Sequence, residues 1–564
     1  MRELTLFDFK IDKKEKRDAY DKVLDFIDSE RCYDGTVCVL YGLRRTGKTT
    51  IMQQLIAENS DRLSFVFLEA EKKDTMNDVY NILEEAVENK VNCVFIDEIT
   101  NIPDFVDDSA LLADIYAKEG IRIVLAGTDS LSFIFAENSP LYGRVENIST
   151  TYIPFEEHCR VLGTKDMDDY ISYGGLMKKG DKPSDHFVYD YQSACRYLDD
   201  AVSANISRSL QCLAKYANED TLAKVTQEEM STVIEKFVEK YSGVLDSELA
   251  NEELKKVVLS FPTDRKDFRE LEGVEIFKNL RANKPDIVRE FAATINADTR
   301  IVHKFDDNMI AKLENHLIRL GFVSAINHQE FVYDEDMGWN SIPTYKEYYL
   351  IQPAIKYYHL KETLDFVETN KYYRNLSEAG KQFVMDKLDS KIKGDMTEQI
   401  VVYEMSKALP RNKYFVCKVS FSNSVPDNSA GEYDMLIYDK TKNSYYAFEI
   451  KHTTTANQEQ CRHLLDEKFK EIIDYKYGDR ENVCVLYNGT SFKAPTGVEY
   501  LNLSDFVKEV THCKDMEMAI HNLCNGLPIK NLALEKTESG EHPTQNGVSL
   551  NNIDFSLEND DFEL

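Results

Sequence analysis

Residues 36–59, TVCVLYGLRRTGKTTIMQQLIAEN, contain the stretch that decides the fold of this chain. The apolar run TVCVLY predicts a buried strand, and TTIMQQLIAEN has the spacing of a helix. Between them, Gly42-Leu43-Arg44-Arg45-Thr46-Gly47-Lys48-Thr49 fits the pattern G-x-x-x-x-G-K-[ST]. This pattern binds phosphate when it connects a strand to a helix, so we expect a phosphate-binding P-loop here.

The residue types of the loop suit a nucleoside triphosphate. Glycines let backbone N–H groups turn toward phosphate oxygens, and the N-terminal end of the next helix adds positive charge. Lys48 is expected to reach the β- and γ-phosphates, and the Thr49 hydroxyl to contact Mg²⁺. We therefore predict ATP and Mg²⁺ as cofactors. The predicted cofactor-binding residues are Gly42, Arg44, Arg45, Thr46, Gly47, Lys48, Thr49, Thr50, Asp97 and Thr128.

Two later apolar strands end in polar residues. VNCVFIDEIT ends in Asp97 and Glu98, where Asp97 would orient metal-bound water and Glu98 would polarise the attacking water. IRIVLAGTDS runs into Thr128, which would lie near the γ-phosphate; a plain turn at the end of the strand is the alternative. Arg144, in LYGRVENIS, would neutralise charge in the transition state, in cis or across a subunit boundary, unless it is a solvated surface arginine.

A second group of acidic residues lies in the C-terminal part of the chain. Glu398 is in a predicted helix, Asp434 is in the strand EYDMLIYD, and Glu449 and Lys451 are in SYYAFEIKHT. Residues two apart on a strand share a face, so Glu449 and Lys451 project together. If the two strands pair, Asp434 and Glu449 can bind one divalent cation, with Lys451 beside the water that attacks a phosphodiester. A solvent-facing strand surface is the alternative.

These motifs together resemble two known families. GLRRTGKT, VFIDEI, AGTDS, YGR and IPFEE resemble the motifs of AAA-type ATPases, and more narrowly those of a group of bacterial and archaeal ATPases. The order helix-Glu, strand-Asp, strand-Glu-x-Lys resembles the PD-(D/E)XK nuclease fold, a familiar companion of these ATPases. The resemblance implies ATP phosphohydrolase activity, and a nuclease-like site with Glu398, Asp434 and Glu449 as metal ligands and Lys451 as a catalytic residue.

Hydrophobic periodicity divides the chain into regions. Apolar strands alternate with helices over residues 36–160, which predicts a parallel α/β sheet with helices on both faces. Helical segments follow, and then an aromatic, strand-like stretch that resembles a winged helix. The expected domains are a P-loop AAA-type ATPase domain (1–165), a helical lid (166–284), a winged-helix-like connector (285–370), an α/β restriction-endonuclease-like domain of the PD-(D/E)XK type (371–525) and an acidic tail that is disordered or weakly docked (526–564).

Composition limits the partners of the chain. Its 564 residues include 99 acidic and 68 basic residues, which gives a net charge of −31. This charge excludes a protein that coats nucleic acid by bulk attraction, so DNA binding requires a local basic site. An apolar N-terminal segment is lacking, as is any run of about 18 uncharged apolar residues. We therefore expect a cytoplasmic protein without a membrane partner.

Three functional hypotheses follow from these observations. The first is an ATPase whose nucleotide state regulates a fused Mg²⁺-dependent nuclease acting on DNA, in defence against foreign DNA. The second is an ATP-driven switch or scaffold in which an inactive nuclease fold serves as a binding module. The third is a motor that moves nucleic acid or protein, which requires a homo-oligomeric ring and an arginine acting in trans, with Arg144 as the candidate.

Overall fold

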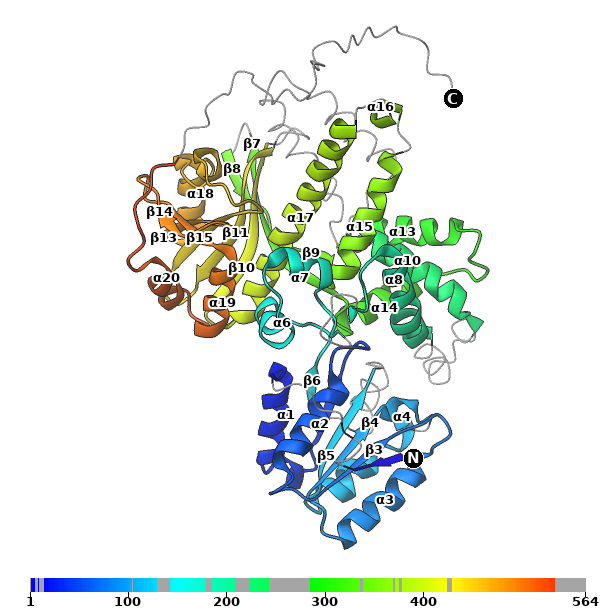
Figure 1. Cartoon of the computed structure of the whole chain (residues 1–564). Helices are drawn as coiled ribbons and strands as arrows, with labels where there is room; N and C mark the ends of the chain where they lie inside the picture. The colour runs from blue at the N-terminus through cyan, green and yellow to red at the C-terminus, as the bar shows by residue number, and fades with distance from the viewer. Residues whose placement is uncertain are drawn as a thin grey trace.

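Figure 1 shows the computed structural model of the chain. The structure describes residues 2–5, 9, 15–103, 105–128, 141, 143–178, 185–207, 224–242, 285–334, 338–368, 371–374, 378–423 and 429–532. These residues build two sheets with helices around them. The N-terminal sheet lies at the bottom of the view, and α6 (Phe155–Leu162) and α7 (Met167–Tyr173) lie between it and the C-terminal sheet (Figure 1).

The N-terminal sheet has the strand order β1-β3-β4-β5-β2-β6. Its neighbouring strands are parallel, except that β1 pairs antiparallel with β3. The bounds are β1 (Arg2–Leu4), β2 (Val37–Tyr41), β3 (Phe65–Glu69), β4 (Cys93–Asp97), β5 (Arg122–Gly127) and β6 (Val145–Ser149). The predicted parallel α/β sheet is therefore confirmed.

Alternate residues of these strands pack on opposite faces of the sheet. Val39 and Leu125 contribute to the core on the side of α3, whereas Leu40 and Val124 contribute to the core on the side of α1 and α2. Both faces are covered, which explains why the strands are apolar throughout. The helices are α1 (Asp18–Asp28), α2 (Lys48–Asn59), α3 (Met76–Glu88), α4 (Phe105–Asp108) and the π-helical turn η4 (Leu112–Ala117).

The described residues between α7 and Val323 form helices and turns, as expected, before strands appear again at Val323. One core joins these helices to one another. The elements are α8 (Tyr191–Tyr197), the π-helical turn η6 (Leu198–Ser203), α10 (Gln227–Ser242), α13 (Pro285–Ala297), α14 (Asp307–Arg319) and α15 (Pro353–Val367). Residues 179–184, 208–223 and 243–284 of the expected lid lie outside the described residues.

The C-terminal sheet has the order β14-β15-β13-β12-β11-β10-β7-β8, and β9 pairs with β7. Its strands are β7 (Val323–Asp334), β8 (Gly338–Ser341), β9 (Tyr345–Leu350), β10 (Tyr414–Asn423), β11 (Ser429–Asp439), β12 (Ser444–Lys451), β13 (Asp479–Tyr487), β14 (Phe492–Lys493) and β15 (Glu499–Asn502). Because β7 pairs in parallel with β10, the sheet crosses the boundary expected at residue 370. The strands of the expected connector are thus part of a larger sheet.

Helices cover this second sheet on both faces. One core combines α15, α17 (Glu378–Ala408), α19 (Leu503–Cys513) and α20 (Met516–Cys524), and the other is closed by α18 (Glu467–Tyr477). A 3-10 turn, η9 (Gln458–Cys461), precedes α18, and the Asp466 side chain caps α18. The short helix α16 (Lys371–Arg374) precedes α17.

The expected tail is described only in its first residues. The Lys493 N–H donates to the Pro528 carbonyl at 3.0 Å, and the Lys530 N–H donates to the Lys493 carbonyl at 3.1 Å. Residues 526–532 therefore run along β14. Residues 533–564 lie outside the described residues. No helix in the described part of the chain is long and apolar enough to span a bilayer.

Candidate functional site

The loop between β2 and α2 has the backbone conformation that its glycines allow. Gly42 and Gly47 have φ angles of +148° and +90°, and Arg45 has a φ angle of +68°. A Cβ atom at Gly42 would lie 2.6 Å from Thr150 Oγ1 and 2.8 Å from the Thr151 nitrogen. Position 42 therefore requires glycine, because the chain after β6 packs directly against it.

Lys48 is buried at the start of α2. Its Nζ donates to the carbonyl oxygens of Gly42 at 2.8 Å and Leu43 at 2.9 Å. Burial lowers the pKa of Lys48 to about 8, against the opposing influence of the nearby carboxylates of Glu98 and Asp97. A phosphate bound in this loop would favour the ammonium form, because an opposite charge stabilises a buried cation.

Thr49 and Asp97 come together at the end of β4. The Thr49 hydroxyl donates to Asp97 Oδ2 at 2.6 Å. Burial raises the pKa of Asp97, and the hydrogen bond from Thr49 opposes that shift. A hydroxyl beside a buried carboxylate is an oxygen-rich pair of the kind that Mg²⁺ prefers, so these residues fit the predicted metal.

Glu98 follows Asp97 in a left-handed conformation, with a φ angle of +52°. Such a conformation is costly for a residue other than glycine and clusters at functional sites. The Glu98 N–H donates to Asp97 Oδ1 at 3.0 Å. The sharp turn separates two adjacent carboxylates, so that Asp97 stays buried while Glu98 is half-buried.

The other predicted residues of this site occupy three environments. Thr128 is buried directly after β5, whose Gly127 pairs with Tyr41 at the end of β2, so it lies at the edge of the sheet that carries the loop. Thr50 is half-buried in the first turn of α2, and Thr46 is buried in the loop. Arg44 and Arg45 are exposed, and the Arg45 guanidinium lies 4.5 Å from the centre of the Phe187 ring.

Arg144 lies at the opposite ends of the strands from the P-loop. Its carbonyl accepts a hydrogen bond from the N–H of Val37, the first residue of β2, at 3.0 Å, whereas the loop follows Tyr41, the last. Four residues of a strand span about 13 Å. The Arg144 side chain is paired with Asp114. This placement does not bring Arg144 to the loop, so a role in cis does not fit; a role across a subunit boundary stays a prediction.

The C-terminal carboxylates meet as their strand pairing requires. Strand β11 pairs antiparallel with β12, with Met435 opposite Phe448, so Asp434 lies next to Glu449. Asp434 Oδ2 accepts the N–H of Ile450 at 2.7 Å and the ammonium of Lys451 at 3.3 Å. Lys451 Nζ also lies 2.8 Å from Glu449 Oε2. The lysine thus bridges both carboxylates.

The charges of this cluster are strongly coupled. Burial alone would raise the pKa of Asp434, but the Lys451 ammonium and the Ile450 N–H lower it. Burial raises the pKa of Glu449 well above its usual value, and the charge of Asp434 adds to this shift. A pair of carboxyl groups with pKa values pushed apart is typical of sites that divide acid and base roles.

Glu398 joins the cluster through Lys418, a residue of β10. Glu398 Oε2 lies 3.6 Å from Lys418 Nζ, and burial raises the pKa of Glu398 well above its usual value. The described residues contain no group of three or more histidine, cysteine or acidic side chains placed to hold a metal ion. Asp434 Oδ1 is buried without a hydrogen-bond partner. Mg²⁺ often binds through one or two carboxylates and water, so a cation held by Asp434 and Glu449 without Glu398 stays a prediction.

Sequence reasoning missed two neighbours of these carboxylates. Lys418 interrupts the apolar strand YFVCKVSFS, and a charged residue in such a strand was a usable signal. His463 Nδ1 lies 3.8 Å from Glu449 Oε1 across the end of the sheet, and no local pattern marks it. Both side chains reach the cluster through tertiary packing.

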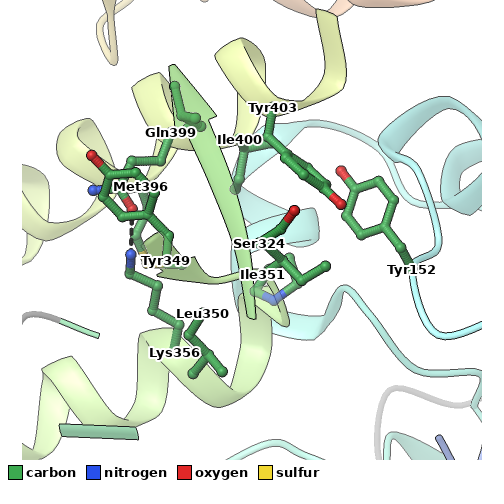
Figure 2. Close-up of a pocket in the computed structure, with 12 residues that line it drawn as sticks. Tyr152, Ser324, Tyr349, Leu350, Ile351, Lys356, Met396, Gln399, Ile400 and Tyr403 are labelled. Atoms are coloured by element: carbon green, nitrogen blue, oxygen red, sulfur yellow. Dashed lines mark hydrogen bonds between the residues drawn. The ribbon is translucent and has the colours of Figure 1, made fainter. Parts of the chain in front are cut away.

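Figure 2 shows a separate cavity of about 30 Å³ beside α17, with room for about two water molecules. Lys356 Nζ donates to Gln399 Oε1 at its edge, and burial lowers the pKa of Lys356 to about 7. The cavity is too small for a nucleotide. It therefore does not compete with the P-loop as the nucleotide site.

Residues 34–159 match the model of a family described as an AAA domain. With the geometry above, this match defines an AAA-type P-loop ATPase domain, a nucleotide-binding class, in the N-terminal part of the chain. The comparison with curated proteins found no match.

Two solved structures are similar to this chain at a low level. One is AMPPCP-bound DnaA from Aquifex aeolicus, with 14% identity, a TM-score of 0.20, and 56% of this chain and 90% of that chain covered. The other is Drosophila ORC bound to DNA, with 12% identity, a TM-score of 0.22, and 58% of this chain and 91% of that chain covered. Scores this low establish neither a shared overall fold nor a shared function.

Proposed function

We propose that the N-terminal site hydrolyses ATP with Mg²⁺, and that its nucleotide state controls a Mg²⁺-dependent nuclease-like site in the C-terminal sheet that acts on DNA. One observation carries the first part. The Thr49 hydroxyl donates a hydrogen bond to Asp97 Oδ2 at 2.6 Å, and the ammonium of the neighbouring, buried Lys48 contacts backbone carbonyls of the P-loop. A hydroxyl, a carboxylate and an ammonium so arranged provide the contacts that a triphosphate and its metal need.

Each residue of the N-terminal site has a separate role in this proposal. Lys48 would leave its carbonyl partners and bind the β- and γ-phosphates, and Thr49 and Asp97 would hold Mg²⁺. Glu98 would accept a proton from the attacking water. The oxygen of that water would bond to the γ-phosphorus while the bond between the γ-phosphorus and the β–γ bridging oxygen breaks, which releases ADP. The bound Mg²⁺ would neutralise charge on the phosphate oxygens.

The C-terminal site is assigned on the pairing of Asp434 with Glu449. These two carboxylates would hold the cation, and the buried Asp434 Oδ1 would gain the partner that it lacks. Lys451, freed from the carboxylates by that cation, would contact the phosphodiester. The cation would polarise the phosphodiester and lower the pKa of the attacking water. Lys418 keeps Glu398 paired within the same cluster.

Two buried contacts join the N-terminal domain to the helix that carries Glu398. The chain after β6 enters α6 through residues 150–155, and there the Phe155 N–H donates to Glu404 Oε1 at 2.9 Å. The Tyr152 hydroxyl donates to the same oxygen. Glu404 and Glu398 are both residues of α17. A shift of residues 150–155 with nucleotide state would therefore move the helix of the C-terminal site.

A further contact links α7 to the end of β12, beside the C-terminal carboxylates. His452 Nε2 lies 3.1 Å from Asp168 Oδ1, and Lys393 Nζ lies 3.4 Å from the same oxygen. His452 follows Lys451 directly in the chain. This contact supports the proposal because it places a residue of the expected lid beside the strand end that carries the lysine.

Cleavage assays test the nuclease part of the proposal. The full chain with Mg²⁺ is expected to cut DNA at a rate that changes when ATP is added. Asp434→Asn should abolish cutting and leave ATP turnover within about twofold of the wild type. Asp479→Asn, an exposed change on β13 of the same sheet, is the matched control and should cut normally. Cutting that survives Asp434→Asn and Glu449→Ala would refute the site assignment.

The alternative proposal is an ATP-driven switch or scaffold with an inactive nuclease fold. The bridge formed by Lys451 between Asp434 and Glu449 favours it, because an ammonium already balances both carboxylates. Measuring DNA affinity against salt separates the two proposals. A nuclease should bind DNA more weakly as salt rises, and a lack of DNA binding in every nucleotide state would favour the switch.

A further inference from the structure

Three successive carbonyl groups of the P-loop are held by donors from outside the loop. The Arg44 carbonyl accepts the Tyr197 hydroxyl at 2.8 Å, and the Arg45 carbonyl accepts the Met177 N–H at 2.8 Å. The Thr46 carbonyl accepts Nη1 of Arg17. The loop is therefore fixed on one side, peptide by peptide.

These hydrogen bonds to the carbonyls also determine where the N–H groups of the loop point. In a trans peptide the C=O and the following N–H point in opposite directions. Holding the carbonyls of residues 44–46 outward therefore directs the N–H groups of residues 45–47 the other way. The left-handed φ angles of Arg45 and Gly47 belong to the alternating conformations that make successive N–H groups converge on an anion.

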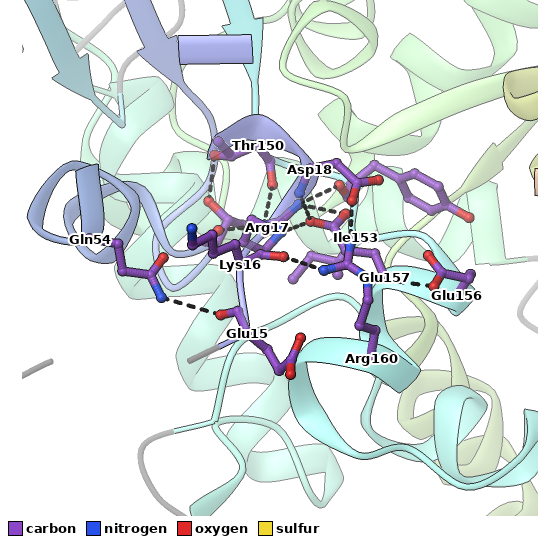
Figure 3. A network of polar contacts seen from close by, with 12 residues as sticks. Glu15, Lys16, Arg17, Asp18, Gln54, Thr150, Ile153, Glu156, Glu157 and Arg160 are labelled. Carbon is purple, nitrogen blue, oxygen red and sulfur yellow. Dashed lines mark hydrogen bonds and ion pairs between the residues drawn. The ribbon is translucent and has the colours of Figure 1, made fainter. Parts of the chain in front are cut away.

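The side chain of Arg17 is itself held rigidly, as Figure 3 shows. Its Nη2 donates to the Tyr152 carbonyl at 3.1 Å and to Glu157 Oε2 at 3.3 Å, while Nε donates to Glu157 Oε1. Arg17 and Glu157 are only 4% and 2% exposed. Glu157 also accepts the N–H of Asp18 at 2.8 Å. A guanidinium locked in this way presents its N–H to the Thr46 carbonyl without losing further side-chain entropy.

All three donors lie outside the residues that match the AAA family. Arg17 precedes α1, Met177 follows α7, and Tyr197 ends α8. The loop thus receives its phosphate-binding shape from segments on both sides of the domain in the chain.

We propose that Arg17 and Tyr197 are positioning residues for the triphosphate: by holding the carbonyls of Thr46 and Arg44, they orient the neighbouring N–H groups toward the phosphates. This inference rests on the proposed binding of ATP. The competing explanation is that both residues only stabilise the packing of the helices on the domain.

The test is equilibrium titration of the full chain with ATP and with ADP. Tyr197→Phe removes one hydroxyl and should weaken both nucleotides about fivefold, the effect of losing one buried hydrogen bond. Arg17→Lys keeps the charge beside Glu157 but lacks the guanidinium fork, and should weaken them about tenfold. The matched control is Tyr500→Phe, because the Tyr500 hydroxyl donates to the Asn457 carbonyl at 2.7 Å within the C-terminal lobe. Its dissociation constants should match the wild type.

The titration separates positioning from packing. A positioning role raises the dissociation constant and leaves the number of sites per chain at the wild-type value, whereas lost packing lowers the number of competent sites without changing the constant. Unchanged constants for Tyr197→Phe, with Lys48→Ala weakening ATP binding as expected, would overturn this inference alone. Failure of the wild type to bind ATP would overturn the proposed function as well. Tyr197→Phe keeps the test usable if Arg17→Lys does not fold.

Discussion

Arg45 and Glu98 have left-handed backbone conformations in the N-terminal site. Arg45 lies in the P-loop, and Glu98 directly follows β4. A non-glycine residue in such a conformation costs about 1–3 kcal/mol, and persists only where the surroundings determine it. At Arg45 the surroundings are two hydrogen bonds: the Met177 N–H donates to the Arg45 carbonyl, and the Tyr197 hydroxyl donates to the Arg44 carbonyl. At Glu98 they are the ends of β4 and the turn that follows. Two of the five non-glycine residues with left-handed φ angles in the described part of the chain thus belong to the proposed nucleotide site.

Lys48 gives the simplest prediction at this scale. Lys48→Ala removes a charged hydrogen-bond donor to phosphate and should weaken ATP binding about 100-fold. Lys22→Ala, an exposed change on α1, is the control and should bind ATP normally. Fluorescence titration with an ATP analogue measures both. Equal affinity of Lys48→Ala and wild type would show that ATP does not occupy this loop.

Motif residues could be predicted from the sequence because each motif is continuous in the chain. Lys48 and Thr49 follow the glycine loop, and Asp97 ends an apolar strand, so spacing alone placed them in one site. Arg17 and Tyr197 could not be predicted, since they reach the loop across 29 and 153 residues of chain. Arg144 does not reach the loop because it precedes β6, which runs parallel to β2, so it lies at the N-terminal ends of both strands while the loop follows the C-terminal end of β2.

Helix α17 is the element that connects the two proposed sites. It carries Glu398 in the C-terminal cluster and Glu404 at the contact with Tyr152 and Phe155. Burial raises the pKa of Glu404 to about 7, although hydrogen bonds from Tyr152 and Phe155 oppose this shift. The junction between the domains therefore contains a carboxyl group that titrates near neutral pH.

Stability should depend on pH through Glu404. Its pKa rises from 4.5 to about 7 on folding, so the folded protein takes up a proton in that window. The corresponding stability is present below pH 4.5 and is lost as pH rises through 7, at a cost of about 3 kcal/mol. Glu404→Gln keeps the acceptor oxygen without the charge. Thermal unfolding should show a higher midpoint for Glu404→Gln than for wild type at pH 8, and equal midpoints at pH 4.

The control for this prediction is Glu119→Gln, an exposed change in the N-terminal domain. It should follow the wild type at both pH values. If Glu404→Gln also unfolds at the wild-type midpoint at pH 8, the junction does not hold a buried charge, and the proposed route between the sites loses its support.

Most strands could be predicted because their apolar runs are bounded by polar turns. Two features of the fold, the π-helical turns and the pairing of β7 with β10, could not be predicted from periodicity. The π-helical turns at Leu112–Ala117 and Leu198–Ser203 depend on local packing rather than on a sequence pattern. The pairing of β7 with β10 joins residues about 90 apart, as Cys417 opposite Asn327 illustrates, and no local signal marks such a partner.

At the scale of the molecule, α6, α7 and residues 150–155 connect the N-terminal sheet to the C-terminal sheet (Figure 1). The net charge of −31 still excludes general attraction of DNA, but Lys418 and Lys451 place two ammonium groups within the acidic cluster. DNA contact is therefore proposed only at that local site.

A ring-forming motor would need Arg144 to act on a neighbouring subunit. Within one chain Arg144 is paired with Asp114 at the far edge of the sheet, so Arg144→Ala should change ATP turnover by less than about twofold in a monomer. Turnover measured beside light scattering checks this expectation. A large loss of turnover in a protein that forms oligomers would instead support the trans role and the motor hypothesis.

Release of phosphate from ATP by the full chain, compared between wild type and Glu98→Gln, tests the central claim most directly. The wild type should release phosphate with Mg²⁺. Glu98→Gln keeps the size of the side chain but cannot accept the proton of the attacking water, so its rate should fall about 100- to 10,000-fold while ATP still binds. No phosphate release by the wild type, or equal rates for the two proteins, would contradict the account.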